Sequence, residues 1–138
     1  MSSQADCALV LVVERDPNVR ELESFFLSEA GFSVEFADDG RAALATARER
    51  KPAIIVTEIM VPEMDGLELC RKVKQDPELS DSVVLIFSIL AAHSRAREAG
   101  ADAFLMKPLA ERQLVQTVRE LLARRSAMQA RSPEGTEQ

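Results

Sequence analysis

Short apolar runs alternate with helix-like segments along the whole chain. Most of the runs are unbroken by polar residues, which is typical of strands buried on both faces of a parallel sheet. The second run instead alternates Phe32, Val34 and Phe36 with polar residues, which indicates a strand nearer the sheet edge. The predicted strands cover residues 8–13, 32–37, 53–57, 83–88 and 103–106.

The segments between the runs have the spacing of amphipathic helices. Asp16 is a good N-cap, Pro17 is tolerated at the first helical position, and Gly31 ends the first helix. Its predicted inward face consists of Val19, Leu22, Phe26 and Ala30. Further helices are predicted over residues 41–50, 67–74 and 111–125, with a single turn over 94–99.

Strands that alternate with helices predict a doubly wound α/β fold. In such a sheet, the functional crevice lies at the carboxyl ends of the strands. Polar residues follow four of the predicted strands there and form the candidate site: Glu14, Arg15 and Asp16, then Glu58, Ser88 and Lys107.

Composition narrows the possible functions. The 138 residues are 46% hydrophobic, which suits one compact domain over residues 1–125, and residues 126–138 lack apolar periodicity and are predicted to be a disordered tail. A net charge of -6 argues against direct nucleic-acid binding. No run approaches the ~20 apolar residues of a membrane span, no secretory signal is evident, and Cys7 and Cys70 are expected to be reduced thiols. We therefore expect a cytoplasmic protein.

Two motifs resemble the receiver domain of bacterial two-component response regulators. Residues 54–66 are similar to its phosphoacceptor strand and following loop, and residues 99–108 are similar to its fifth strand and lysine–proline ending. The resemblance covers about residues 8–125. It implies a flavodoxin-like, five-stranded parallel sheet in the order 2-1-3-4-5 with helices on both faces.

The resemblance also assigns roles to the candidate site. Glu58 falls where the family has its phosphoacceptor Asp, and Glu14, Arg15 and Asp16 fall in the acidic pocket that binds Mg²⁺, aided by the backbone carbonyl of Met60. Ser88 and Phe104 match the two switch positions. Lys107 matches the phosphate-sensing lysine, and Pro108 is a candidate for a cis peptide bond.

Arg15 and Glu58 depart from the family pattern. A guanidinium cannot ligate Mg²⁺, which requires oxygen ligands, and the extra methylene of Glu58 displaces the nucleophile. Arginine in place of aspartate changes the charge of the site by +2, the charge that Mg²⁺ would supply. One hypothesis is that Arg15 replaces the metal and pairs with Glu58 or Glu14. The alternative is that Arg15 points into solvent beside a decayed site.

Glu58 and its neighbours leave several interpretations open. Glu58 either imitates the phosphorylated state partly, in which case Ser88 should bond to it and Phe104 should be buried, or is held in an inactive-like arrangement. Asp16 is expected to act as a helix cap and the lone His93 to be solvated. Residues 89–92 are unusually apolar: either they alter a partner-binding face, or Leu90 fills core space left by a shortened fourth helix.

We therefore expect a single-domain, phosphorylation-independent signalling protein that binds other proteins. We do not expect it to be an enzyme or to have a cofactor. Mg²⁺ would be needed only if the family's phosphorylation site is still functional. Expected partners are a histidine kinase or another signalling protein, or a second copy bound through the fourth helix, fifth strand and last helix. The alternatives are a conventional phospho-accepting regulator and a receiver module whose output domain is missing.

Overall fold

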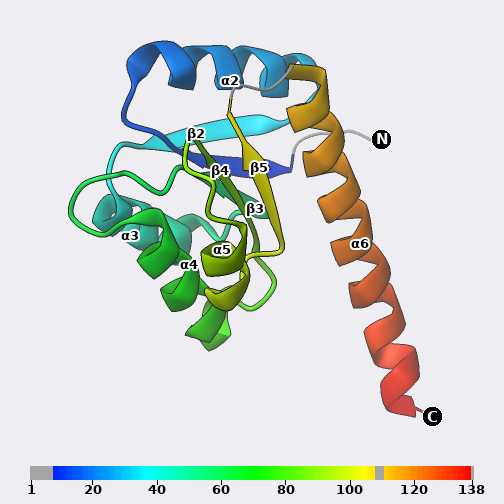
Figure 1. Cartoon of the computed structure of the whole chain (residues 1–138). Coiled ribbons are helices and arrows are strands. Elements are labelled where there is room, and N and C mark those ends of the chain that lie inside the picture. The colour runs from blue at the N-terminus through cyan, green and yellow to red at the C-terminus, as the bar shows by residue number, and fades with distance from the viewer. Residues whose placement is uncertain (1–7, 108–110, 138) are drawn as a thin grey trace.

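The structure, a computed structural model, describes residues 8–107 and 111–137, with side chains in the last helix described over residues 113–128. Its centre is a five-stranded parallel sheet in the order β2-β1-β3-β4-β5 (Figure 1). The predicted flavodoxin-like fold is therefore confirmed. The strands are β1 (Leu9–Val13), β2 (Ser33–Ala37), β3 (Ile54–Thr57), β4 (Val83–Ser88) and β5 (Ala103–Met106).

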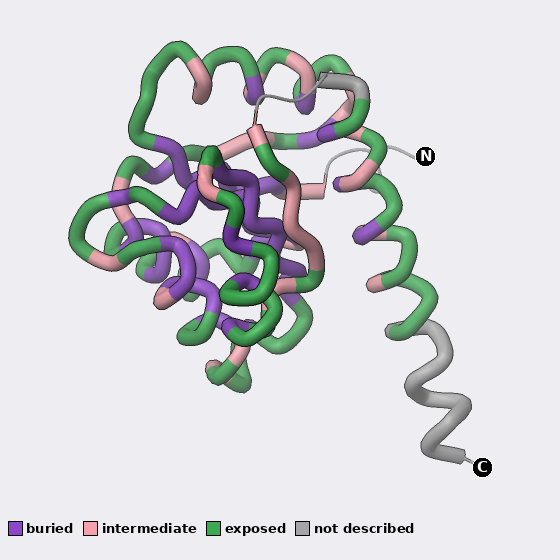
Figure 2. Tube along the Cα trace, in the orientation of Figure 1, coloured by how far each residue is buried: buried purple, intermediate pink, exposed green. Residues whose placement is uncertain are grey.

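Helices cover both faces of the sheet (Figure 1). One face packs against α2 (Pro17–Glu29) and α6 (Glu111–Glu137), and the other packs against α3 (Gly40–Arg50), α4 (Gly66–Gln75) and α5 (His93–Glu98). A short 3-10 helix, η1 (Pro77–Leu79), precedes β4. The buried residues concentrate in the sheet and on the helix sides that face it (Figure 2).

The alternation of side chains along β1 divides the interior into two apolar clusters. Leu11 and Val13 point toward α3 and α4, whereas Val10 and Val12 point toward α2 and α6. All four are at most 1% exposed. A strand buried on both faces in this way explains why its sequence is continuously apolar.

The face of α2 differs from the predicted one. Leu22, predicted to face inward, is 50% exposed, and the buried residues of the helix are Glu23 and Leu27. The helix is turned by about one residue, so that the inward stripe passes through position 23 at helical spacing from Val19. The prediction used only apolar residues, so it did not recognise an inward stripe that contains a glutamate.

Two other helices bear on the predictions. The single turn expected before β5 is confirmed as α5, only six residues long. The end predicted for the last helix is wrong, because α6 continues past residue 125 through the expected disordered tail to Glu137. Residues 126–131 contain no glycine or proline and include good helix formers, although they lack apolar periodicity.

A few expectations concern other parts of the chain. Pro108 and Cys7 lie outside the described residues. Cys70 is buried in α4, and burial, the largest effect, raises the pKa of its thiol to about 11, so it is an inert core residue. Among the described helices, none is both long and apolar enough to cross a membrane.

Candidate functional site

The site residues extend the parallel pairing one residue beyond the strands. The amide of Glu14 donates to the Ala37 carbonyl at 3.1 Å, and that of Glu58 donates to the Val13 carbonyl at 3.0 Å. The amide of Lys107 donates to the Ser88 carbonyl at 2.8 Å. These bonds fix the three site residues at the carboxyl edge of the sheet, where the crevice of a doubly wound fold lies.

The loop that follows Glu58 depends on a glycine. Thr57 Oγ1 donates to the Glu58 carbonyl at 2.9 Å, and the amide of Gly66 donates to the Ile59 carbonyl at the same distance. A Cβ at Gly66 would lie only 2.2 Å from the Glu58 carbonyl oxygen. The start of α4 can therefore approach Glu58 this closely only because position 66 has no side chain.

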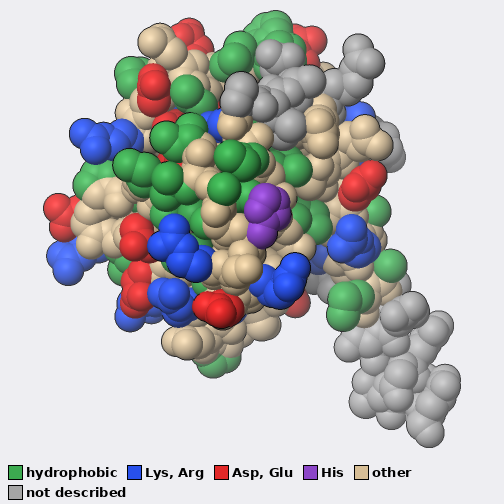
Figure 3. Space-filling view, viewed as in Figure 1, with side chains coloured by type: hydrophobic (Ala, Val, Ile, Leu, Met, Phe, Trp, Pro, Cys, Tyr) green, Lys and Arg blue, Asp and Glu red, His purple; other side chains and the backbone are tan. Residues whose placement is uncertain are grey.

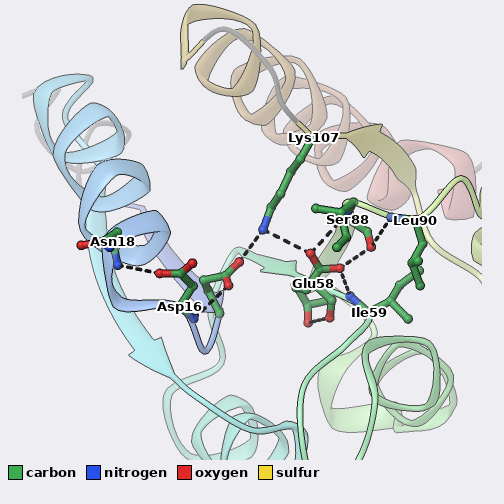
Figure 4. Close-up of polar contacts among 10 residues, drawn as sticks. Asp16, Asn18, Glu58, Ile59, Ser88, Leu90 and Lys107 are labelled. Atoms are coloured by element: carbon green, nitrogen blue, oxygen red, sulfur yellow. Dashed lines mark hydrogen bonds and ion pairs between the residues drawn. The ribbon is translucent and has the colours of Figure 1, made fainter.

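The Glu58 carboxylate collects hydrogen-bond donors from three segments (Figure 4). Oε1 accepts from the Ser88 hydroxyl and, at 2.7 Å, from the Ile59 amide. Oε2 accepts from the Ile89 amide at 3.3 Å and lies 3.2 Å from Lys107 Nζ. Burial tends to raise the pKa of Glu58, but Ser88, Lys107 and Ile59 together hold it below the ordinary value. Glu58 is therefore a stable anion.

Lys107 bridges the two acidic residues. Its Nζ lies 2.5 Å from Glu14 Oε1 as well as 3.2 Å from Glu58 Oε2, and all three side chains are at most 11% exposed. Burial tends to lower the pKa of Lys107, yet the two carboxylates raise it above the ordinary value. The lysine is thus charged and joins the ends of β1, β3 and β5.

Arg15 does not fill the metal position. Its side chain is exposed, and within the described part of the chain it forms no ion pair with Glu14 or Glu58. The hypothesis that it pairs with them is therefore wrong in this structure, because Lys107 already occupies the space between the carboxylates. Asp16, also exposed, is the predicted N-cap, since its Oδ1 accepts from the Asn18 amide at 2.9 Å.

The residues present do not fit Mg²⁺. Glu14 Oε1 is bonded to Lys107 and Oε2 accepts from the Asp16 amide at 3.0 Å, while both oxygens of Glu58 are also engaged. Within the described ranges, no group of three acidic, histidine or cysteine side chains could hold a metal. Met60, whose carbonyl was the remaining predicted ligand, is 55% exposed in the loop beyond Glu58.

Glu23 is a site residue that the sequence analysis missed. It is 6% exposed on α2, and the charges of Lys107, Glu14 and Glu58 act on its carboxyl group. Burial is the main cause that raises its pKa to about 8, Lys107 opposes the shift, and the two carboxylates add to it. Glu23 therefore holds a proton at neutral pH. Its helical spacing from Val19 and Leu27 was the signal that could have found it.

The two switch positions are in different states of burial. Ser88 is fully buried; its hydroxyl donates to Glu58 and accepts from the Leu90 amide at 3.1 Å. Phe104 is half-buried, packs against the core cluster beside α3, α4 and α5, and has the His93 ring 4.3 Å away. His93, expected to be solvated, is exposed, but its ring lies against that of Phe104 at an interplanar angle of 54°. Leu90 packs against the same cluster, which supports its predicted space-filling role.

Comparison with known proteins identifies the family. Residues 10–119 match the model of the response regulator receiver domain, so the chain belongs to that family and is a receiver domain of two-component signalling. It is similar to the response regulator MprA of Mycolicibacterium vanbaalenii, with 38% identity over 118 residues, which are 83% of this chain and 50% of that protein.

Two other similar proteins agree with this assignment. One is the DNA-binding dual master transcriptional regulator RpaA of Synechocystis, 31% identical over 83% of this chain and 49% of that protein. The other is the solved receiver domain of a signal transduction histidine kinase from Syntrophus aciditrophicus, with 33% identity, a TM-score of 0.80, and coverage of 85% of this chain and 91% of that one. The chain spans about half the length of the curated relatives it matches.

Proposed function

We propose that this receiver domain signals without phosphorylation, as a binding protein and not an enzyme, with Glu58 as a built-in substitute for the phosphorylated residue. The observation that carries the proposal is the set of donors around the Glu58 carboxylate. A hydroxyl, two backbone amides and an ammonium group converge on it, from Ser88, Ile59, Ile89 and Lys107. Such donors suit a phosphoryl group equally well.

The lost metal chemistry supports the same conclusion. Phosphoryl transfer depends on in-line positioning and on a cation that neutralises the transferred charge. Here Lys107 closes the space between Glu14 and Glu58, and Arg15 cannot replace the missing metal ligand. We infer that the chain needs no Mg²⁺ and no other cofactor.

The switch residues favour partial mimicry of the active state. The bond from Ser88 to Glu58 is the one expected of a phosphoryl-like group at this position. Phe104 is only half-buried, in keeping with a carboxylate that has one charge and two oxygens where a phosphate has nearly two charges and three. We therefore infer that the domain is close to the active arrangement but does not fully adopt it.

The face formed by α5, β5 and α6 is our candidate for partner binding, either by another signalling protein such as a histidine kinase or by a second copy. Met106 of β5 is 40% exposed, and the chain's one histidine, His93, covers Phe104. Figure 3 shows this histidine beside hydrophobic side chains, with basic side chains close by. A face whose centre contacts a switch residue can transmit the state of that residue to a partner.

The test is an NMR titration of backbone amides with Mg²⁺ and then with beryllofluoride, an analogue of the phosphoryl group. We expect no site-localised shift near Glu14, Glu58 or Met60, because Lys107 occupies the gap between the carboxylates. Saturable, Mg²⁺-dependent shifts that spread to Ser88 and Phe104 would contradict the proposal. They would favour a conventional phospho-accepting regulator.

A second candidate is a receiver module that works together with an output domain. It is favoured by the length of the relatives, of which this chain matches about half, and RpaA among them is a DNA-binding regulator. The net charge of -6 assigns any DNA contact to another domain or partner. The state of Glu58 would then be passed on through the same α5–β5–α6 face.

A further inference from the structure

A pocket lies at the opposite end of the sheet from Glu58. It has a volume of about 320 Å³, and its lining includes Val83 at the start of β4 and Asp102, which directly precedes β5. The site residue Ser88 ends β4, about 16 Å away along the strand. A volume of this size lies in the range of small-molecule sites, which begins at about 300 Å³.

One wall of the pocket is a continuous stripe of α6. Leu121, Arg124, Arg125 and Met128 all line it, and their spacing places them on one side of the helix. Leu121 is 3% exposed against the sheet, whereas Met128 is 66% exposed, where α6 extends away from the body of the domain (Figure 1). The stripe is therefore packed against the sheet at Leu121 and projects beyond the sheet at Met128.

The charges in the pocket favour an anion. Lys74 and Asp102 neutralise each other, with Nζ and Oδ2 2.7 Å apart. Arg125 Nε donates to the Asp81 backbone carbonyl at 2.5 Å, and within the described residues neither Arg125 nor Arg124 forms an ion pair. Two guanidinium groups against the single carboxylate of Asp81 leave an excess of one positive charge in a chain that is acidic overall.

The apolar part of the lining is aliphatic. Val83, Leu121 and Met128 contribute it, and methionine adapts its shape readily to a bound group. Guanidinium groups bind carboxylates and phosphates through paired hydrogen bonds. We propose that this pocket binds a small organic anion, an aliphatic carboxylate or phosphate monoester, with its head group held by Arg124 and Arg125. The proposal is independent of how Glu58 functions.

The experiment is an NMR titration of the full chain with hexanoate, butyl phosphate, inorganic phosphate and 1-hexanol. We expect saturable shifts in residues 80–83 and 121–128 with hexanoate or butyl phosphate, at an affinity at least about tenfold higher than for phosphate or hexanol, because only these probes fill both parts of the pocket. Equal binding of inorganic phosphate, shifts confined to the Glu58 end, or no shifts at all would overturn the proposal.

Substitutions in α6 decide whether the arginines hold the head group. Arg124→Gln and Arg125→Gln should each weaken binding by about tenfold, and Arg97→Gln, an equal charge change on an exposed residue of α5, should change it less than about twofold. Equal losses in all three variants, or none, would contradict the assignment. Arg124 is exposed and has no described ion pair, so its variant remains informative if Arg125→Gln does not fold.

Discussion

Three acidic side chains share one lysine at the carboxyl edge of this sheet. Glu14 and Glu58 are paired with Lys107, whereas Glu23 is a buried residue of α2 that interacts electrostatically with the same group. If all three carboxylates were ionised, the negative charge would exceed that of the lysine by two. The raised pKa of Glu23 relieves this excess, since it leaves that carboxyl protonated at neutral pH.

Glu23 should make the stability of the domain depend on pH. Its pKa is about 8 in the folded chain and near 4.5 when exposed, so between these values the folded state binds more protons than the unfolded state. The free energy of unfolding should therefore fall as pH rises through this window, by up to about 5 kcal/mol at about 1.4 kcal/mol per unit. Glu23→Gln, which cannot ionise, should lack this fall in urea denaturation at pH 5.5 and pH 8.

A neighbouring glutamate provides the control. Glu21 lies on the same helix but is exposed, so Glu21→Gln should keep the wild-type pH dependence. If the wild type and Glu23→Gln lost stability in parallel between the two pH values, Glu23 would not be the group that titrates.

At the scale of the elements, Lys107 connects the strands at their carboxyl ends. It contacts carboxylates that follow β1 and β3, and its own backbone amide is bonded to the end of β4. One residue thus links the ends of four strands: its side chain reaches β1 and β3, and its backbone joins β4 to β5.

Removal of that side chain should be costly. Lys107→Met leaves Glu14 and Glu58 buried without their cation, which should lower the free energy of unfolding by about 3–5 kcal/mol at pH 7. Lys107 helps to hold the pKa of Glu58 low, and that contribution is present above the unfolded pKa of 4.5 and lost as pH falls through the folded value. The difference from the wild type should therefore shrink in acid.

The exposed pair of Lys72 and Glu68 on α4 gives the matched comparison. Their charged atoms are 3.8 Å apart, and both side chains are nearly half exposed, so Lys72→Met should cost less than about 1 kcal/mol by urea denaturation. A similar, small cost for Lys107→Met would show that the buried bridge contributes nothing special.

Most of the elements, but not every side-chain direction, could be predicted from the sequence. The strands and their order followed from unbroken apolar runs and the family motifs, and Glu58, Ser88 and Lys107 meet because parallel strands end at one edge. The face of α2 was missed because its stripe contains Glu23. The direction of Arg15 was left open, because a charge count cannot tell which cation fills a gap. Such choices depend on distances between residues far apart in the chain.

At the scale of the whole molecule, the receiver fold is complete although Arg15 and Glu58 differ from the family pattern. Both apolar clusters are formed by residues other than Glu14, Arg15 and Glu58. Changes at these three positions should therefore leave the apolar core intact. It follows that the pocket can be rebuilt without loss of the scaffold.

Arg15→Asp combined with Glu58→Asp should restore Mg²⁺ binding. The two changes supply the carboxylates of the family pattern, and the shorter Asp at position 58 withdraws from Lys107, which opens space for an ion with oxygen ligands at ~2.0–2.1 Å. Mg²⁺ should then shift the amides of Glu14, Met60 and position 58 in a saturable way. Glu58→Asp alone should stay insensitive, because Arg15 still cannot ligate a metal. If the double variant also ignored Mg²⁺, Lys107 and Glu23 would be the groups that close this site.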